Sequence, residues 1–293
     1  METLGGNRMK VLVTGAGGQL GFDVMRELTH RGIEAKGTTR QELPLTDADA
    51  MRKCILSYAP DTIIHCAAYT AVDQAEDEPK TALAVNGEST RYLAELCGEI
   101  GAKLIYISTD YVFPGTGDEF YETDAPKSPQ NVYGRSKLAG EQHVQEVLDR
   151  YFIVRISWVF GIHGKNFIRT MLRLSETHDE LKVVDDQIGS PTYTVDLSRL
   201  LVDLAETEKY GVYHATNEGV CSWAELAAET FRQYGRETRV VPVPSAEYPT
   251  KAVRPKNSRM SKKSLDDAGF QRLPNWKDAV GRYLIELSAE RER

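Results

Sequence analysis

The stretch Lys10-Val-Leu-Val-Thr-Gly-Ala-Gly-Gly-Gln-Leu-Gly21 decides the fold of this 293-residue chain. After Lys10, the next four residues are apolar or β-branched, which is typical of a buried parallel strand. Three glycines spaced G-x-x-G-x-x-G follow, and then apolar residues at helical intervals. This order predicts a dinucleotide-binding unit, because glycine lets the backbone approach a pyrophosphate at a helix N-terminus. The candidate cofactor-binding residues in this stretch are Gly15, Gly18, Gln19, Leu20 and Gly21.

A second strand is predicted near Ile33–Thr38, and the residues after it normally read the adenosine ribose. An acid at this point favours NAD, whereas an arginine favours NADP. The chain has Arg40 and no acid in place. The sequence therefore predicts that Arg40 contacts NADPH, with NADH as an alternative cofactor. The plainer alternative for Arg40 is a solvated loop residue.

Two further strands are predicted at Asp61–His65 and Lys103–Ile107. The small residues Ala67 and Ala68 follow the first, where a backbone could pass close to a bound cofactor. Thr109 follows the second, at the carboxyl end of the strand, which is where open parallel sheets bind ligands. Its hydroxyl could polarise a substrate carbonyl, although capping the strand is the simpler role.

Tyr133 and Lys137 are four residues apart in a helix predicted over Asn131–Leu148, so they share one face. A nearby ammonium favours the phenolate and lowers the pKa of a tyrosine, which gives the tunable acid or base that carbonyl reduction needs. The spacing alone is common by chance. The glycine turn and Thr109 upstream favour a catalytic role for the pair.

Composition excludes several functions. The net charge of −7 argues against a nucleic-acid partner or an anionic membrane surface. No apolar stretch approaches the roughly 18 residues of a membrane helix, and residues 1–8 lack the apolar core of a signal peptide. The four cysteines form no C-x-x-C pair and indicate reduced core thiols in a cytoplasmic protein. Neither histidine spacing nor clustered carboxylates predict a metal site.

The regular alternation of strands and helices predicts an α/β fold with a doubly wound, Rossmann-like parallel sheet. The long helix that begins at Pro79 includes Asn86, for which an exposed helix position is the simple expectation, although periodicity does not decide it. We expect a dinucleotide-binding domain at 9–157, with sheet contributions from about 186–215. A smaller C-terminal α/β domain at 158–293 is expected to bind the substrate.

A basic, Pro-rich loop is predicted over Val241–Ser258. In an acidic protein, local cations could bind a diphosphate, and a solvated loop is an equal alternative. Its cations are Lys251, Arg254, Lys256 and, just beyond it, Arg259.

Together these segments resemble the extended short-chain dehydrogenase/reductase family, and within it the dTDP-4-dehydrorhamnose reductases. The likeness covers residues 9 to about 287. The segments that carry it are Gly-Gly-Gln-Leu-Gly21, Ser108-Thr-Asp-Tyr-Val-Phe-Pro-Gly115, Asn131-Val-Tyr-Gly, Ser157-Trp-Val, Gln187-x-Gly-x-Pro-Thr192 and Arg254-Pro-x-Asn-Ser258.

The resemblance implies that NAD(P)H reduces the 4-keto group of a 6-deoxy sugar linked to dTDP. Tyr133 would deliver the proton to O4, and Thr109 would polarise the carbonyl. Lys137 would hold the nicotinamide ribose and lower the Tyr133 pKa. Dimers are common in the family, so a homodimer is a further expectation that the residues leave open. The implied substrate-binding residues are Thr109, Asp110, Tyr111, Tyr133, Trp158 and, facing the diphosphate, Arg254.

Two other readings remain open at this point. A nucleotide-sugar epimerase or dehydratase of the same family would keep NAD bound, which the missing acid near Arg40 disfavours. A non-catalytic regulatory subunit, like the one that accompanies methionine adenosyltransferase, could use the same scaffold. The intact set of Thr109, Tyr133 and Lys137 favours catalysis.

Overall fold

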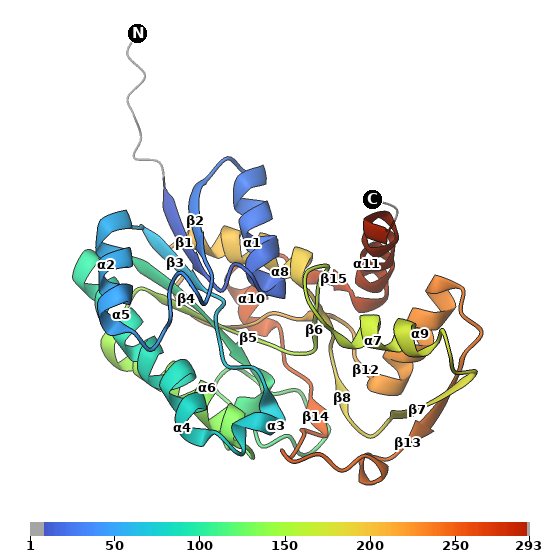
Figure 1. Ribbon diagram of the computed structural model, residues 1–293. Helices are drawn as coiled ribbons and strands as arrows, with labels where there is room; N and C mark the ends of the chain where they lie inside the picture. The colour runs from blue at the N-terminus through green and yellow to red at the C-terminus, as the bar shows by residue number, and fades with distance from the viewer. Residues whose placement is uncertain (1–8, 292–293) are drawn as a thin grey trace.

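The computed structural model describes residues 9–291, and its centre is a six-stranded parallel sheet (Figure 1). The strand order is β2-β1-β3-β4-β5-β10. The chain leaves β1 to form β2 on one side and then crosses to β3 on the other. The switch point therefore lies between β1 and β3, where a sheet of this kind binds its ligand. The strands are β1 (Lys10–Thr14), β2 (Glu34–Thr38), β3 (Thr62–His65), β4 (Lys103–Thr109), β5 (Tyr151–Ile156) and β10 (Gly211–His214).

Helices cover both faces of this sheet, which confirms the predicted doubly wound α/β fold. Side chains alternate along a strand, so Val11 and Val13 enter the core beneath α1 and α8. Leu12 enters the opposite core, beneath α2, α5 and α6. The helices around the sheet are α1 (Gln19–His30), α2 (Ala48–Tyr58), α3 (Val72–Ala75), α4 (Pro79–Leu83), α5 (Ser89–Ile100), α6 (Val132–Val147), α8 (Thr194–Ala205) and α10 (Lys263–Asp267).

The helix predicted from Pro79 is α4 and α5 joined by a π-helical turn, η1 (Ala84–Glu88). Asn86 lies in this turn and is 1% exposed, so the expectation of an exposed residue is wrong. The side-chain amide can be buried because its hydrogen-bonding groups have partners. Its oxygen accepts from Tyr69 N at 2.8 Å, and its nitrogen donates to Tyr69 O at 3.0 Å and to the Ser136 hydroxyl. The turn thereby fixes the segment after β3 against α6.

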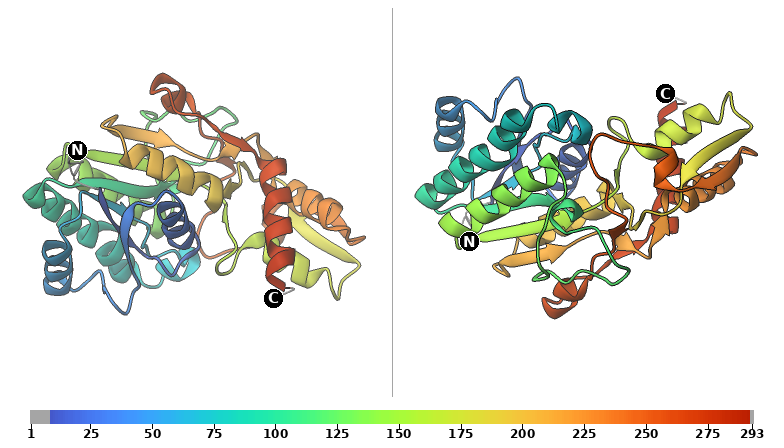
Figure 2. Two further views of the ribbon diagram at one scale, coloured as in Figure 1. Left: turned by 90° about the horizontal axis from the view of Figure 1, so that it is seen from above. Right: turned by 90° about the horizontal axis from the view of Figure 1, so that it is seen from below.

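A smaller group of elements lies beside the sheet rather than over it (Figures 1 and 2). Its core forms between α7 (Phe167–Leu174), α9 (Trp223–Tyr234) and α11 (Trp276–Arg291). The parallel strands β7 (Glu180–Val184) and β13 (Arg239–Val243) pack against α9. The predicted loop thus begins with a strand; Pro242 is tolerated there because β13 is an edge strand.

Short elements connect the two parts of the molecule. They are β6 (Val159–Phe160), β8 (Ile188–Gly189), β9 (Thr192–Tyr193), β11 (Asn217–Glu218), β12 (Cys221–Ser222), β14 (Asn257–Ser258), β15 (Leu273–Asn275), and the 3-10 turns η2 (Asp110–Val112) and η3 (Ser245–Glu247).

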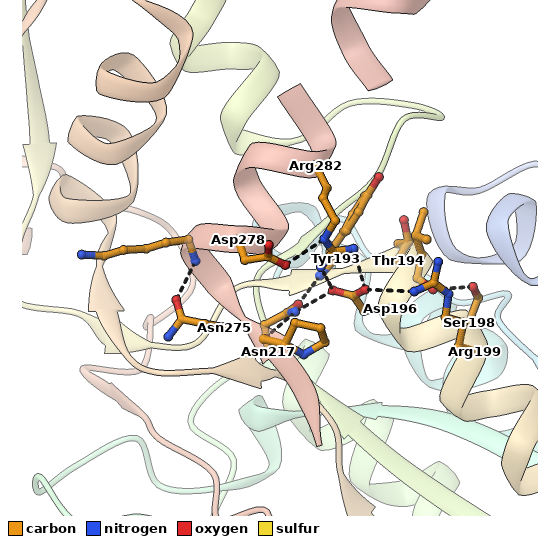
Figure 3. Close-up of polar contacts among 12 residues, drawn as sticks. Tyr193, Thr194, Asp196, Ser198, Arg199, Asn217, Asn275, Asp278 and Arg282 are labelled. Carbon is orange, nitrogen blue, oxygen red and sulfur yellow. Dashed lines mark hydrogen bonds and ion pairs between the residues drawn. The ribbon is translucent and has the colours of Figure 1, made fainter. Parts of the chain in front are cut away.

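A buried carboxylate joins α8 to α11 (Figure 3). Asp196 of α8 is 4% exposed and accepts both terminal nitrogens of Arg282 at 2.7 and 2.6 Å. The Asn217 amide adds a third hydrogen bond at 2.8 Å. Arg282 also pairs with Asp278 of its own helix at 2.8 Å. This fully paired cluster anchors the C-terminal helix to the layer that covers the sheet.

Across residues 9–291, no helix combines the length and the apolar composition that crossing a lipid bilayer requires.

Candidate functional site

A cleft of about 800 Å³ opens at the carboxyl ends of β1, β3 and β4, next to the switch point. Every site residue singled out from the sequence lines this cleft, although those residues come from segments that are far apart in the chain. They are Gly15, Gly18, Gln19, Leu20, Gly21, Arg40, Ala67, Ala68, Thr109, Asp110, Tyr111, Tyr133, Lys137, Trp158 and Arg254.

The glycine turn lies against the backbone after β3, and two of its three motif glycines, Gly15 and Gly21, leave no room for a side chain. Gly15 has a φ of +70°, and a Cβ atom there would lie 2.7 Å from the backbone nitrogen of Ala67. A Cβ at Gly21 would overlap the Gly15 carbonyl oxygen, so the helix packs directly on the turn. Gly18 caps the N-terminus of α1, which borders the cleft. The turn therefore fits a pyrophosphate, which needs close backbone approach and free helix N–H groups.

The two residues after Gly18 also hold the turn in place. The Gln19 side-chain oxygen accepts hydrogen bonds from Gly161 N at 3.1 Å and Asn166 Nδ2 at 3.2 Å. Leu20 packs into the core beneath α1. The glycine turn is thereby tied both to the sheet and to the smaller group of elements.

Arg40 is exposed and lines the cleft, two residues after the end of β2. The nearest acid in sequence, Glu42, accepts hydrogen bonds from the backbone N and the hydroxyl of Thr39, both at 2.8 Å. The acid is engaged by the turn, while the guanidinium borders the cleft.

Tyr133 of α6 also lines the cleft, with its ring edge-on to Tyr111 at 5.4 Å between centroids. Burial is the main cause that raises the pKa of Tyr133, and Asp110 raises it further, while a hydrogen bond with Thr109 lowers it. The prediction that Lys137 lowers this pKa is therefore wrong for the chain alone. The loss of hydration outweighs the other influences, and the phenol stays protonated at neutral pH.

Lys137 is 3% exposed, and its ammonium lies 4.1 Å from the centre of the Tyr106 ring. Within residues 9–291, no carboxylate lies within ion-pair distance of this ammonium. Burial lowers the pKa of Lys137 to about 7, while Glu141 and then Cys66 act in the opposite direction. The lysine is thus a cation that is only weakly compensated, on the same helix face as Tyr133.

Asp110 bridges the two parts of the molecule beneath the cleft. One carboxylate oxygen accepts the Thr109 hydroxyl at 3.0 Å, and the other accepts the Ser258 hydroxyl of β14 at 2.5 Å. Burial raises the pKa of Asp110 to about 6, although both hydroxyls act against that rise. The Thr109 hydroxyl must therefore turn away from Asp110 before it can donate to a substrate.

Arg254 forms part of the wall between Tyr111 and α3. It donates to the Tyr111 hydroxyl at 3.0 Å and pairs with Asp73 at 2.6 Å. Of the four cations noted in and beside the basic loop, only Arg254 lines the cleft. The others pair elsewhere: Lys251 with Asp77, Lys256 with Asp186, and Arg259 with Asn257.

The cleft contains a pair of aromatic residues, of which the sequence predicts only Trp158 as a site residue. Trp158 adopts a positive φ of +50° and stacks on Trp223 of α9 at 3.8 Å and 16°. Both rings line the cleft, and Trp223 donates to Gln187 at 3.1 Å. In the sequence, Trp223 merely follows the helix cap at Ser222, and no local signal places it opposite Trp158. For the same reason, the sequence does not predict that Asp73 pairs with Arg254 or that Ser258 donates to Asp110.

The cysteines and metal-binding side chains add no further chemistry to the site. The four cysteines are unbridged, and two of them, Cys97 and Cys221, are buried. In the described part of the chain, no three side chains of histidine, cysteine, aspartate or glutamate gather in a way that could hold a metal ion.

Comparison with known proteins agrees with this geometry. Residues 9–289 match the family model described as the RmlD substrate binding domain. A protein of Streptomyces griseus named dTDP-4-dehydrorhamnose reductase is 44% identical over 280 residues, covering 93% of this chain and 92% of the relative. A dTDP-4-keto-6-deoxy-D-glucose reductase of Streptomyces niveus is 40% identical over 281 residues, covering 95% of this chain and 98% of that one.

A solved structure gives the same result. The crystal structure of dTDP-4-dehydrorhamnose reductase from Bacillus anthracis in complex with NADP superposes with a TM-score of 0.93. The two chains are 42% identical, with 95% of this chain and 99% of that one covered. Family, fold and cleft agree, and the chain belongs to the RmlD substrate binding domain family, the family of the dTDP-4-dehydrorhamnose reductases.

Proposed function

We propose that this protein reduces dTDP-4-dehydro-6-deoxy-L-mannose (dTDP-4-dehydrorhamnose) to dTDP-L-rhamnose with NADPH. One observation carries the proposal: the glycine turn, the Tyr133–Lys137 face and Arg254 all border a single cleft. This arrangement allows a reduced dinucleotide and an anionic nucleotide sugar to meet at one tyrosine. The names of the Streptomyces griseus relative and of the solved structure support the same activity.

The glycine turn would hold the cofactor pyrophosphate, and Arg40 would hold the 2′-phosphate that distinguishes NADPH from NADH. The solved relative binds NADP, which supports this choice. An arginine–phosphate contact of this kind is worth about tenfold in affinity. Arg40→Ser should therefore raise the KM for NADPH about tenfold and leave the KM for NADH unchanged. Equal effects on both cofactors would remove Arg40 from this role.

The catalytic roles follow from the protonation states in the cleft. The bound nicotinamide supplies the hydride that reaches C4 of the sugar. Tyr133 keeps its proton at neutral pH, so it can donate that proton to O4 as negative charge develops there. Thr109 would donate a hydrogen bond to the same oxygen after leaving Asp110. Lys137 would stabilise the phenolate that remains and orient the cofactor ribose.

Arg254 is the residue that we assign to the substrate diphosphate. Its present partners are one phenol and one carboxylate, Tyr111 and Asp73. A diphosphate offers more acceptor oxygens than the single Asp73 carboxylate and can displace it. The stacked Trp158 and Trp223 rings would provide an apolar wall for the deoxy sugar.

The Streptomyces niveus relative supports a second candidate substrate, dTDP-4-keto-6-deoxy-D-glucose. The two sugars carry the same 4-keto group, so the catalytic residues do not distinguish them. The walls formed by Trp158, Trp223 and Arg254 would decide between them.

The test is to follow NADPH oxidation with each of these 4-keto sugars and to identify the product. We expect faster turnover of the L-sugar. Faster turnover of the D-sugar would move the assignment to the second candidate. NADPH binding without oxidation of either would favour the epimerase, dehydratase or regulatory-subunit readings.

We further propose the division into a cofactor domain at 9–157, completed by β10, and a mainly substrate-binding domain at 158–293. A homodimer remains part of the proposal, and sedimentation of the purified protein tests it.

A further inference from the structure

Helix α6 carries a third buried polar residue on the face that bears Tyr133 and Lys137. Glu141 follows Lys137 by four residues, so the three side chains stack along one side of the helix. Glu141 is 1% exposed. It does not line the cleft; it lies one turn further from it than Lys137.

Side chains from two strands, β4 and β5, fix the Glu141 carboxylate in place. Arg155 of β5 donates to both of its oxygens, at 2.8 and 2.7 Å. Ser108 of β4 donates to one of them at 2.5 Å. Arg155 is itself held by the Thr123 carbonyl at 2.8 Å and contacts His214 of β10 at 3.3 Å. The carboxylate therefore cannot move without disturbing the carboxyl ends of these strands.

The groups that face Lys137 are otherwise uncharged at neutral pH. From β3 and the residue after it, burial lowers the pKa of His65 to about 3 and raises that of Cys66 to about 12. From β4, burial raises the Tyr106 pKa well above its usual value. On α6, the Tyr133 pKa is raised as well. Beyond Glu141 lies Arg155, and burial lowers the pKa of His214, which contacts it, to about 3.

We propose that Glu141 is a positioning residue for the reaction, which acts through Lys137: its carboxylate, held by Arg155 and Ser108, keeps the ammonium of Lys137 charged in the cleft that it lines together with Tyr133. This inference rests on the proposed function. Glu141 itself does not touch the substrate or the cofactor.

The consequence is a change in pH dependence. Removing the negative charge lowers the Lys137 pKa, because the buried ammonium then has no anion near it. Lys137 must be protonated during reduction, so activity is lost as pH rises through its pKa. Glu141→Gln should therefore shift the alkaline limb of the kcat profile to lower pH, by about one pH unit.

The experiment compares pH profiles of kcat for wild type, Glu141→Gln and Glu146→Gln. Glu146 lies on the same helix but is exposed, so its variant removes the same charge without the proposed contact and should keep the wild-type profile. Glu141→Gln leaves Arg155 buried without its anion, which could unfold the protein. The double variant Glu141→Gln/Arg155→Met removes both charges and should show a smaller shift in the same direction, because the Arg155 cation no longer opposes the charge on Lys137.

A second readout does not depend on turnover. The pH dependence of Lys137 acetylation by acetic anhydride, followed by mass spectrometry, reports the lysine pKa directly. A lower midpoint in both Glu141 variants supports the inference even if the wild type fails to reduce the proposed sugar. Unchanged midpoints and profiles, or activity lost equally at every pH, would show that Glu141 serves the fold alone.

Discussion

Two buried charged sites in this molecule differ in how fully their charges are paired. At the α8–α11 junction, Asp196 has Arg282 and Asn217 as partners, and hydrogen bonding to Asp196 is the main cause that raises the Arg282 pKa (Figure 3). In the cleft, burial raises the Asp110 pKa to about 6 and lowers the Lys137 pKa to about 7. Pairing raises the pKa of Arg282 and keeps it charged, whereas burial moves the pKa values of Asp110 and Lys137 toward neutral pH. A buried charge that is only weakly compensated costs stability. It is retained in the cleft because proton transfer requires groups that titrate near neutral pH.

The largest expected effect comes from removing the cleft ammonium. Lys137→Met should lower kcat about 10³-fold, because the phenolate left on Tyr133 loses its cation. It should also stabilise the protein, since a buried charge without a partner is removed.

The size of this stability effect depends on pH. The Lys137 pKa is about 7 in the folded protein and near 10.5 when unfolded, so the unfolded chain binds more protons between these values. Wild-type stability from this group therefore rises with pH across that window. The advantage of Lys137→Met, measured by thermal unfolding, should be greatest near pH 6 and shrink by about pH 9. An advantage that grows with pH would contradict the account.

Breaking the paired site should have the opposite result. Arg282→Met leaves Asp196 buried without its main cation and should cost about 3 kcal/mol in the free energy of unfolding, measured with urea. The KM for NADPH should not change, because neither residue lines the cleft. Lys277→Met on the same helix, at an exposed position, is the matched control. A loss below about 0.5 kcal/mol would show that the junction is not held by this pair.

A smaller effect is expected at the rim of the cleft. Arg254→Gln should raise the KM for the nucleotide sugar about tenfold, with kcat and NADPH affinity nearly unchanged, because a diphosphate contact is lost. Lys256→Gln, which removes a charge two residues away but outside the cleft, should behave as wild type. Steady-state kinetics with varied sugar concentration distinguish the two. Equal KM values would place the diphosphate elsewhere.

The sequence predicts the segments from β1 to α6 well and the tertiary partners around the cleft poorly, for a physical reason. The segment from β1 to α6 is built from local signals, such as the apolar run before Gly15 and the four-residue spacing of Tyr133 and Lys137. The partners Asp73 of Arg254 and Trp223 of Trp158 meet only through tertiary packing.

The two errors inside well-predicted elements have the same origin. Asn86 is polar in a helix, but a π-helical turn buries it against Tyr69. The Tyr133 pKa depends on how strongly burial outweighs nearby charge, and residue spacing contains no measure of burial.

The most direct test of the account is NADPH oxidation by Tyr133→Phe, measured beside wild type with dTDP-4-dehydrorhamnose. The account predicts a loss of turnover of about 10³-fold or more, because the variant has no proton to give to O4, while NADPH still binds with nearly wild-type affinity. Turnover within about tenfold of wild type would contradict it, since the proton would then reach the sugar from another group.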